Sequence, residues 1–177
     1  MRELVNRKNL DTKAFCVLTK NNFTIGDLQI ETFRTSHDAA DPMGLSCYNG
    51  KHKLTFMTDT GLVDDTMLKN MDESDLLVLE ANYDPQMLKY GPYPFDLKKR
   101  VAGPYGHLSN EHAAQALLMM KRPEHLQVVM AHRSEKNNEQ AVVTDTVTTA
   151  LTAEGLIMKQ DITIFHGQPK EMVTIRA

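Results

Sequence analysis

Two short apolar stretches decide the fold: DLLVLEAN at residues 75–82 and LQVVMAH at residues 126–132. Each run is nearly continuous and too short for a helix, which is typical of a strand buried within a sheet. Between them, SNEHAAQALLMMKR (109–122) predicts a helix, with Ser109 or Asn110 as its N-cap and Pro123 behind its end. Strand and helix therefore alternate in this half of the chain.

The flanking sequence extends this pattern in both directions. Downstream, residues 137–155 predict a long helix that Gly155 ends, and strands are expected at 162–166 and 172–176. Upstream, strands are expected at about 14–19, 22–34, 43–49 and 52–58, and Asn49-Gly50 is expected to form a hairpin turn. The apolar residues of 62–71 have helical spacing. Residues 84–101 predict short helices broken at Pro92 and Pro94. We expect a layered α/β protein whose mixed sheet has helices on one face.

The composition limits the classes of protein to consider. A chain of 177 residues without a linker-like stretch or repeat is expected to form a single domain, residues 1–177. A net charge of −3 does not mark a dedicated nucleic-acid binder, although local basic patches remain compatible with it. Two cysteines are too few for a thiol metal cluster. Without a signal peptide or an apolar membrane span, we expect a cytoplasmic protein.

The stretch ETFRTSHDAADPMGLSCYNGKHKLTFMTDTG (31–61) carries a histidine and three aspartates at the tips of two apolar strands: His37, Asp38, Asp41 and Asp59. Asp59 emerges where a buried strand ends, a place where an unpaired charge is costly. It either caps the segment that starts near Gly61 or binds a metal ion. Taken alone, His37 is more simply interpreted as a solvated or hydrogen-bonded loop residue. Together the four residues suggest a metal site.

Two further histidines lie at comparable places. His132 is the first polar side chain after the strand at 126–131, and His107 precedes the helix that begins near Ser109. A helix N-terminus presents free N–H groups, so imidazole and amides could hold a phosphate there; a local capping bond is the alternative for His107. In open α/β sheets, functional groups gather where strands end. Three histidines and an aspartate in such places favour a site.

A short basic run, Lys98, Lys99 and Arg100, stands just ahead of GHLSN (106–110). Such a run is usually a solvated helix face. Beside a phosphate-binding site it would draw in a polyanion.

These residues resemble a known family. IGDLQIETFRTSHDAADPMG (25–44), TDTG (58–61), LEANYDPQMLKYGPYPFDLKKRVAGPYGHLSN (79–110) and AHRSEKNN (131–138) are similar to the metallo-β-lactamase-fold hydrolases of the WalJ/YycJ type, also called VicX. The resemblance implies a sandwich of two mixed sheets with helices outside. It also implies the nuclease and phosphodiesterase branch of that superfamily, with two-metal hydrolysis of nucleic-acid phosphodiesters.

Carried over to this sequence, the resemblance assigns individual roles. His37, Asp59 and His132 would be metal ligands, with Asp59 bridging two ions. Asp59 and His107 would be catalytic, and His107 would contact the scissile phosphate or stabilise the leaving group. Imidazole and carboxylate ligands suit Zn²⁺ or Mn²⁺. Residues expected to bind substrate are Ser109, Asn110, Lys98 and Lys99.

The sequence departs from the family in one respect. The family motif His-x-His-x-Asp-His is absent, because no two of the seven histidines are separated by a single residue. The chain therefore resembles the C-terminal part of such an enzyme. Three ligands are expected to hold at most one ion weakly, so this chain alone is expected to be inactive. An uncovered sheet face predicts self-association or a complementing N-terminal half. The alternative is a non-catalytic remnant that binds nucleic acid or a protein.

Overall fold

The structure is a computed structural model that describes residues 20–168 and 174–175. Its strands are β1 (Asn22–Ile25), β2 (Leu28–Arg34), β3 (Met43–Asn49), β4 (His52–Met57), β5 (Leu76–Glu80), β6 (Leu126–Ala131) and β7 (Ile162–His166). Its helices are α2 (Asp65–Met71), α3 (Pro85–Tyr90), α4 (Phe95–Val101), α5 (Asn110–Met119) and α6 (Gln140–Ala153). No helix within the described ranges is long and apolar enough to cross a membrane.

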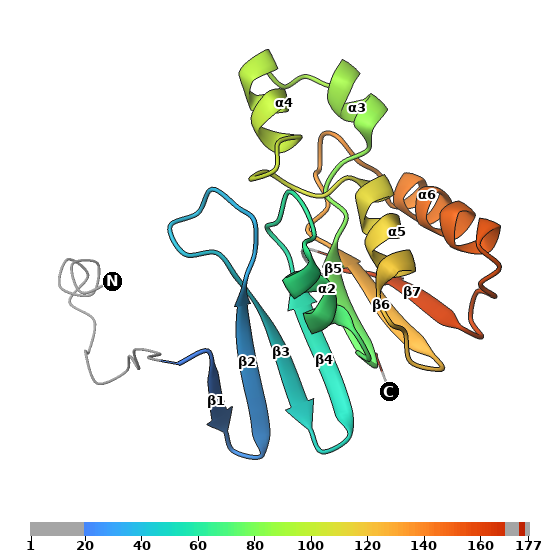
Figure 1. The fold of residues 1–177 in the computed structure, drawn as a ribbon. Coiled ribbons are helices and arrows are strands. Elements are labelled where there is room, and N and C mark those ends of the chain that lie inside the picture. The colour runs from blue at the N-terminus through green and yellow to red at the C-terminus, as the bar shows by residue number, and fades with distance from the viewer. Residues whose placement is uncertain (1–19, 169–173, 176–177) are drawn as a thin grey trace.

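The seven strands form one mixed sheet in the order in which they occur along the chain. Neighbours are antiparallel from β1 to β4 and parallel from β4 to β7. Strands β2, β4, β5 and β6 consequently run in the same direction, and their carboxyl ends meet at one edge of the sheet. Helices α3 and α4 lie beyond that edge (Figure 1).

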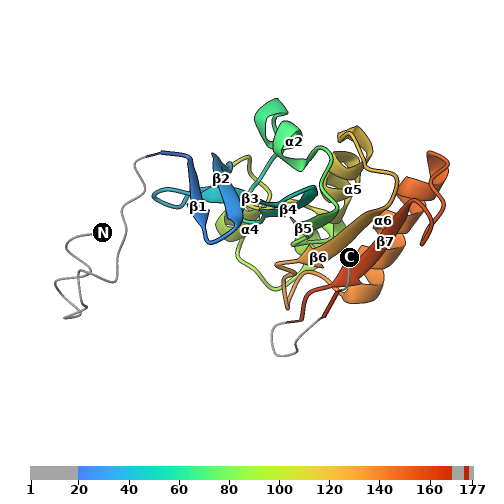
Figure 2. The ribbon, with the colours of Figure 1, turned by 90° about the horizontal axis from the view of Figure 1, so that it is seen from below.

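One face of the sheet carries the main core. Leu77 and Leu79 of β5 are fully buried, as is Val128 of β6, and they pack with side chains of α5 and α6 such as Leu117 and Val147. Helices α2 and α5 lie on the same side of the sheet (Figure 2). Because successive strand residues point to opposite faces, only alternate residues of each strand reach this core.

The opposite face is also apolar but only partly covered. The strand register aligns a row of side chains across it: Leu45, Phe56, Val78, Val129 and Phe165. Four of them are half-buried, and Phe56 is 41% exposed. The sheet therefore has one well-packed face and one partly open apolar face.

The mixed sheet with helices packed on one face is confirmed, and so are two short helices on either side of Pro92 and Pro94. The single strand expected at 22–34 is wrong, because Gly26 (φ +58°) and Asp27 form a tight turn that divides it into β1 and β2. The turn expected at Asn49-Gly50 lies one residue later, at Gly50-Lys51, because Asn49 still pairs with His52.

The sandwich implied by the family resemblance is seen only in part, since the described residues form one sheet rather than two. The strand expected at 14–19 lies outside the described residues. Most of the strand expected at 172–176 does too, and the two residues described there, 174 and 175, belong to no strand.

Candidate metal centre

Three histidines and an aspartate converge at the sheet edge where four strands end. His37 follows β2, Asp59 follows β4, His132 follows β6, and His107 lies in the loop before α5. The imidazole rings of His37 and His107 have centroids 4.9 Å apart, and those of His107 and His132 are 5.1 Å apart. The structure thus brings together the four residues singled out from their positions in the sequence.

A fifth residue, Glu80, holds two of these histidines in place. It is the last residue of β5 and is fully buried. Its Oε1 lies 2.7 Å from Nδ1 of His107 and 2.7 Å from Nδ1 of His132, and its Oε2 accepts a hydrogen bond from the Thr60 amide at 2.9 Å. A single buried carboxylate therefore fixes two imidazoles and the backbone behind Asp59.

These hydrogen bonds determine which ring nitrogens are free. An ionised carboxylate only accepts, so His107 and His132 must donate through Nδ1, which leaves Nε2 of each ring with its lone pair. The same holds for His37, whose Nδ1 donates to the Gly106 carbonyl at 2.8 Å. Its Nε2 lies 3.6 Å from Oδ1 of Asp59. All three rings are oriented as metal-binding histidines are, with one nitrogen held by the protein and the other available.

The charges of this cluster reinforce one another. Burial favours the neutral form of Glu80, but the hydrogen bonds from His107 and His132, with the Thr60 amide, outweigh it and hold the pKa of Glu80 below its ordinary value. The hydrogen bond to Glu80 raises the pKa of His132 despite burial, and the charges of Glu80 and Asp59 add to this.

The backbone is strained at two of the site residues. Asp59 has φ 55° and His132 has φ 53°, in the left-handed region that residues other than glycine seldom adopt. Each lies just beyond the carboxyl end of a strand, Asp59 after β4 and His132 after β6. Such strain persists where the surrounding structure holds it, and it is common at functional sites.

The donor atoms fit a divalent metal ion. Ligand atoms of His37, Asp59 and His107 lie within 4.8 Å of one another, and so do those of Glu80, His107 and His132. The Asp59 side chain is 46% exposed and accepts a hydrogen bond of 3.3 Å from the neighbouring Thr58 hydroxyl, so its carboxylate can accept a further partner. Imidazole nitrogen and carboxylate oxygen are ligands that suit Zn²⁺ and Mn²⁺.

Of the other two aspartates, Asp38 also lies near the centre, since its Oδ1 is 3.6 Å from Nε2 of His37, the same distance as Oδ1 of Asp59. That all three aspartates belong to the metal site stays a prediction. Asp38 is paired with Arg100 through two hydrogen bonds, of 2.8 and 2.5 Å, and Asp41 is paired with Arg34 at 2.9 Å. The hydrogen bond to Arg100 lowers the pKa of Asp38. The Asp38–Arg100 pair fastens the His37 loop to the end of α4.

The four converging residues line an open pocket of about 650 Å³, which we call the metal pocket. Arg100 and Tyr93 contribute to one side of it, and residues 133–136 contribute to the other. Its size lies within the range of small-molecule sites.

None of the four residues expected to bind substrate, Lys98, Lys99, Ser109 and Asn110, is among the residues that line this pocket. Lys99 is exposed, whereas Nζ of Lys98 donates to the Lys89 carbonyl at 2.8 Å and ties α4 to α3. Ser109 is buried and caps α5 by accepting from the amide of His112. Asn110 is buried and exchanges hydrogen bonds with Asn138. The structure therefore places Lys99 on the surface and Ser109 and Asn110 inside the fold.

Glu80 is the site residue that the sequence analysis did not identify. Glu80 is the last residue of the run LLVLE, and in the sequence it was interpreted only as the polar residue that ends a strand. The sequence does contain a signal for Glu80: a carboxylate that directly follows four apolar residues of a buried strand is expected to be buried itself and to need hydrogen-bond partners. In the structure these partners are two histidines, 27 and 52 residues further along the chain.

Comparisons with known proteins agree with this geometry. Residues 3–133 match the family described as "Beta-lactamase superfamily domain". The chain is 35% identical over 147 residues to "Exodeoxyribonuclease YycJ" of Bacillus anthracis and 32% identical over 146 residues to "Exodeoxyribonuclease WalJ" of Streptococcus pneumoniae D39. These alignments cover 83% and 82% of this chain but 56% and 54% of the relatives. The chain thus spans about half the length of the curated relatives that it matches.

A solved structure gives the same picture of the fold. The metallo-β-lactamase-fold protein YhfI from Bacillus subtilis superposes with a TM-score of 0.60 at 13% identity, over 87% of this chain and 51% of that one. At this identity the likeness concerns the fold alone. The family match extends over most of the chain and includes every residue of the metal pocket up to Arg133. The chain belongs to the β-lactamase superfamily, and its sheet and flanking helices have the metallo-β-lactamase fold.

Proposed function

We propose that this chain carries part of the active centre of a metal-dependent phosphodiesterase that acts on DNA. One observation carries the proposal: three imidazoles, each with Nδ1 bonded to a protein oxygen, converge at the sheet edge beside the exposed carboxylate of Asp59. Oδ1 of Asp59 lies 3.6 Å from Nε2 of His37 and 3.8 Å from Nδ1 of His132. The relatives named exodeoxyribonucleases, at 35% and 32% identity, support the reaction class and the DNA substrate.

In this proposal His37, Asp59 and His132 hold a divalent ion, Zn²⁺ or Mn²⁺. When bound, such an ion supplies Lewis-acid activation of a phosphodiester. His107 is placed to act on the substrate, because its ring lies between His37 and His132 and lines the pocket. With Nδ1 bonded to Glu80, its Nε2 is the atom that exchanges a proton with the leaving oxygen.

The surface around the pocket suits a nucleic-acid strand. Lys99 is exposed in the last turn of α4, and Arg100 lines the pocket. Three strongly exposed aromatic side chains, Tyr90, Phe95 and Tyr105, lie on or next to α3 and α4. Basic groups bind the phosphates and aromatic rings stack on bases, so this combination favours a single strand or a frayed end.

A complementing partner would supply what this chain lacks. The sequence contains no His-x-His-x-Asp-His motif, and the chain spans about half the length of its relatives. The row of apolar side chains around Phe56 offers a surface on which a second sheet could pack. A cytoplasmic location fits a DNA substrate. Should no partner bind, the same missing motif favours the alternative, a non-catalytic module that binds nucleic acid.

The test is metal content, measured by elemental analysis after dialysis of the purified chain against Zn²⁺ or Mn²⁺. The comparison is the double variant Asp59→Ala/His132→Ala, and Asp41→Ala is the matched control because Asp41 pairs only with surface Arg34. The proposal expects an equimolar ion in the wild type and the control and none in the double variant. Equal metal in all three proteins would refute the site, and metal in none would leave the binding-module alternative.

A further inference from the structure

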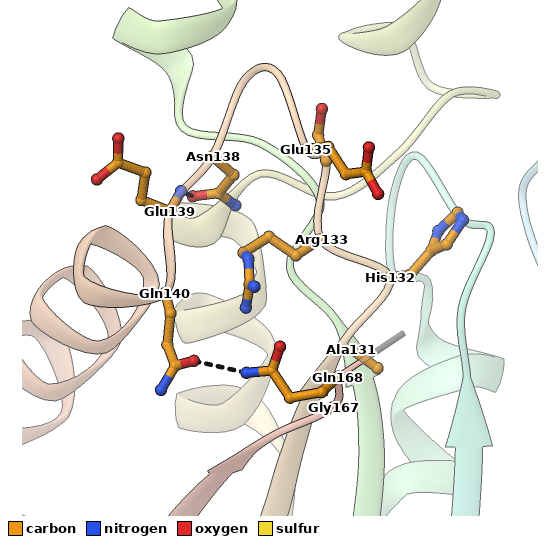
Figure 3. Close-up of a pocket in the computed structure, with 10 residues that line it drawn as sticks. Ala131, His132, Arg133, Glu135, Asn138, Glu139, Gln140, Gly167 and Gln168 are labelled. Atoms are coloured by element: carbon orange, nitrogen blue, oxygen red, sulfur yellow. Dashed lines mark hydrogen bonds between the residues drawn. The ribbon is translucent and has the colours of Figure 1, made fainter. Parts of the chain in front are cut away.

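A second pocket lies beside the metal pocket, on the other side of the loop that joins β6 to α6. It has a volume of about 680 Å³ and is lined by Arg133, Asn138, Glu139, Gln140, Gly167 and Gln168, among others. We call it the arginine pocket (Figure 3). The two pockets share four lining residues, His132 to Glu135. A ligand in one pocket is therefore separated from a ligand in the other by that short segment alone.

The guanidinium of Arg133 lies inside this pocket without a counter-charge. Its Nη1 is fully buried, and among the described residues it has no hydrogen-bond partner. The two carboxylates that line the pocket, those of Glu135 and Glu139, point away from it (Figure 3). A covered positive charge without a partner is unfavourable, so the site favours an anion.

The neighbouring histidine offers no counter-charge, because imidazole is either neutral or positive. Burial and the charge of Arg133 both lower the pKa of His166. Nε2 of His166 is bonded to the Thr144 hydroxyl at 2.9 Å. The Gln140 and Gln168 side chains below the guanidinium bond to each other at 2.7 Å (Figure 3). The groups around Arg133 are thus neutral or turned away.

The start of helix α6 adds a second feature that favours an anion. The helix has 14 residues, and its N-cap residue, Glu139, makes no side-chain capping bond. The N–H groups of its first turn have no acceptor within the helix, and the helix dipole is positive at this end. Oδ1 of Asn138 accepts a hydrogen bond from the Glu139 amide at 3.0 Å, which leaves the amides of the following residues. Because Asn138, Glu139 and Gln140 line the pocket, the start of α6 lies beside the guanidinium.

We infer that the arginine pocket is a phosphate site, which binds the phosphate next to the scissile one in a DNA strand. The identity of the ligand rests on the proposed function, whereas the anion preference rests on Arg133 and α6 alone. A planar guanidinium suits the oxygens of a phosphate, and helix N-terminal amides are frequent phosphate ligands. The pocket also has room for a nucleotide, since sites for small molecules have volumes of about 300–1,000 Å³.

The experiment measures binding without metal, so that it does not depend on the metal centre. The full chain is titrated with inorganic phosphate and with the 5′-phosphorylated dinucleotide pTpT in the presence of EDTA, by calorimetry and by NMR. Arg133→Gln is compared with Lys136→Gln, which removes one positive charge from the same loop at a residue that lines the metal pocket and not the arginine pocket, so the comparison separates the two pockets. We expect Arg133→Gln to weaken binding by about tenfold or more and Lys136→Gln to weaken it less than about threefold.

A second variant guards against misfolding of the first. Gln140→Glu places a carboxylate in the pocket at an exposed position and should also abolish phosphate binding, while the circular dichroism spectrum is retained. The inference is overturned if wild type fails to bind both ligands, or if Arg133→Gln and Lys136→Gln weaken binding equally. Loss of binding in Arg133→Gln with no metal bound by wild type would support the anion site while refuting the proposed metal centre.

Discussion

Glu80 and His107 form a buried ion-pair geometry across 27 residues of sequence, with Oε1 of the carboxylate 2.7 Å from Nδ1 of the imidazole. The same oxygen accepts from His132, so two functional rings share one carboxylate atom. The carboxylate is fully buried, which excludes water from competing for these bonds. The fold therefore orients both rings through the buried carboxylate of Glu80.

Glu80→Gln tests how far this carboxylate prepares the site. An amide cannot accept three hydrogen bonds as an ionised carboxylate can, and its NH₂ group would face an N–H donor. We expect the affinity for Zn²⁺ to fall by about 10- to 100-fold, the usual effect of removing a partner of a metal-binding histidine. Competition with a chromophoric chelator measures it. Unchanged affinity in a folded Glu80→Gln variant would show that the histidines orient themselves.

The stability of the metal-free protein should depend on pH through the same cluster. The pKa of Glu80 is lowered from 4.5, so its stabilising contribution is present above that value and is lost as the pH falls through the folded-state pKa. The pKa of His132 is raised from 6.5, so its contribution is present below that value and is lost as the pH rises through the folded-state pKa. Both contributions are complete between pH 4.5 and 6.5.

Thermal unfolding in EDTA at several pH values checks this window. We expect the difference in Tm between wild type and Glu80→Gln to be largest between pH 4.5 and 6.5 and to shrink on both sides. A difference that stays constant from pH 4 to pH 9 would mean that the shared carboxylate does not couple to titration of the site.

Asp38→Asn examines the link between the His37 loop and α4. The variant removes the charge from the two-bond pair with Arg100, which holds the residue next to His37. We expect metal affinity to fall a few-fold, because His37 then loses the support of its loop, with little change in overall stability since the pair is partly exposed. Asp41→Asn breaks the pair with Arg34, on the same loop, and serves as the control. Equal effects of both variants on metal affinity would contradict this role.

Much of the fold follows from local sequence signals. The apolar runs that became β5 and β6, the helix capped by Ser109 and the breaks at Pro92 and Pro94 were all predictable, because each depends on residues close together in the chain. The turn at Gly26-Asp27 was missed although its signal is in the sequence: Gly-Asp favours a hairpin turn, and the alternation of apolar residues breaks between Ile25 and Leu28.

The sequence predicted only those candidate site residues that stand directly after an apolar strand or before a helix. His37, Asp59 and His132 stand out because each follows an apolar strand. Asp38 pairs with Arg100, 62 residues away in the sequence. Glu80 pairs with His107 and His132, which are 27 and 52 residues away. The three-dimensional arrangement of the strand ends determines which charged side chains pair. A single sequence does not show this arrangement.

The partly open face of the sheet leads to a prediction about association. Phe56 is the most exposed member of the apolar row Leu45, Phe56, Val78, Val129 and Phe165, and it lies in the middle strand of the sheet. Contiguous exposed apolar surface promotes binding to apolar ligands and to other protein surfaces. We expect the purified chain to self-associate and to bind an apolar dye, and Phe56→Ser to reduce both.

The matched control for this experiment is Thr58→Ser, which lies just past the same strand but outside the row. Association is measured by analytical ultracentrifugation over a range of concentrations, and dye binding by fluorescence. Phe56→Ser should leave thermal stability nearly unchanged, because its side chain packs only partly in the monomer. A monodisperse monomeric wild type that binds no dye would mean that this face is already covered within the chain, and a complementing half would then have no surface on which to pack.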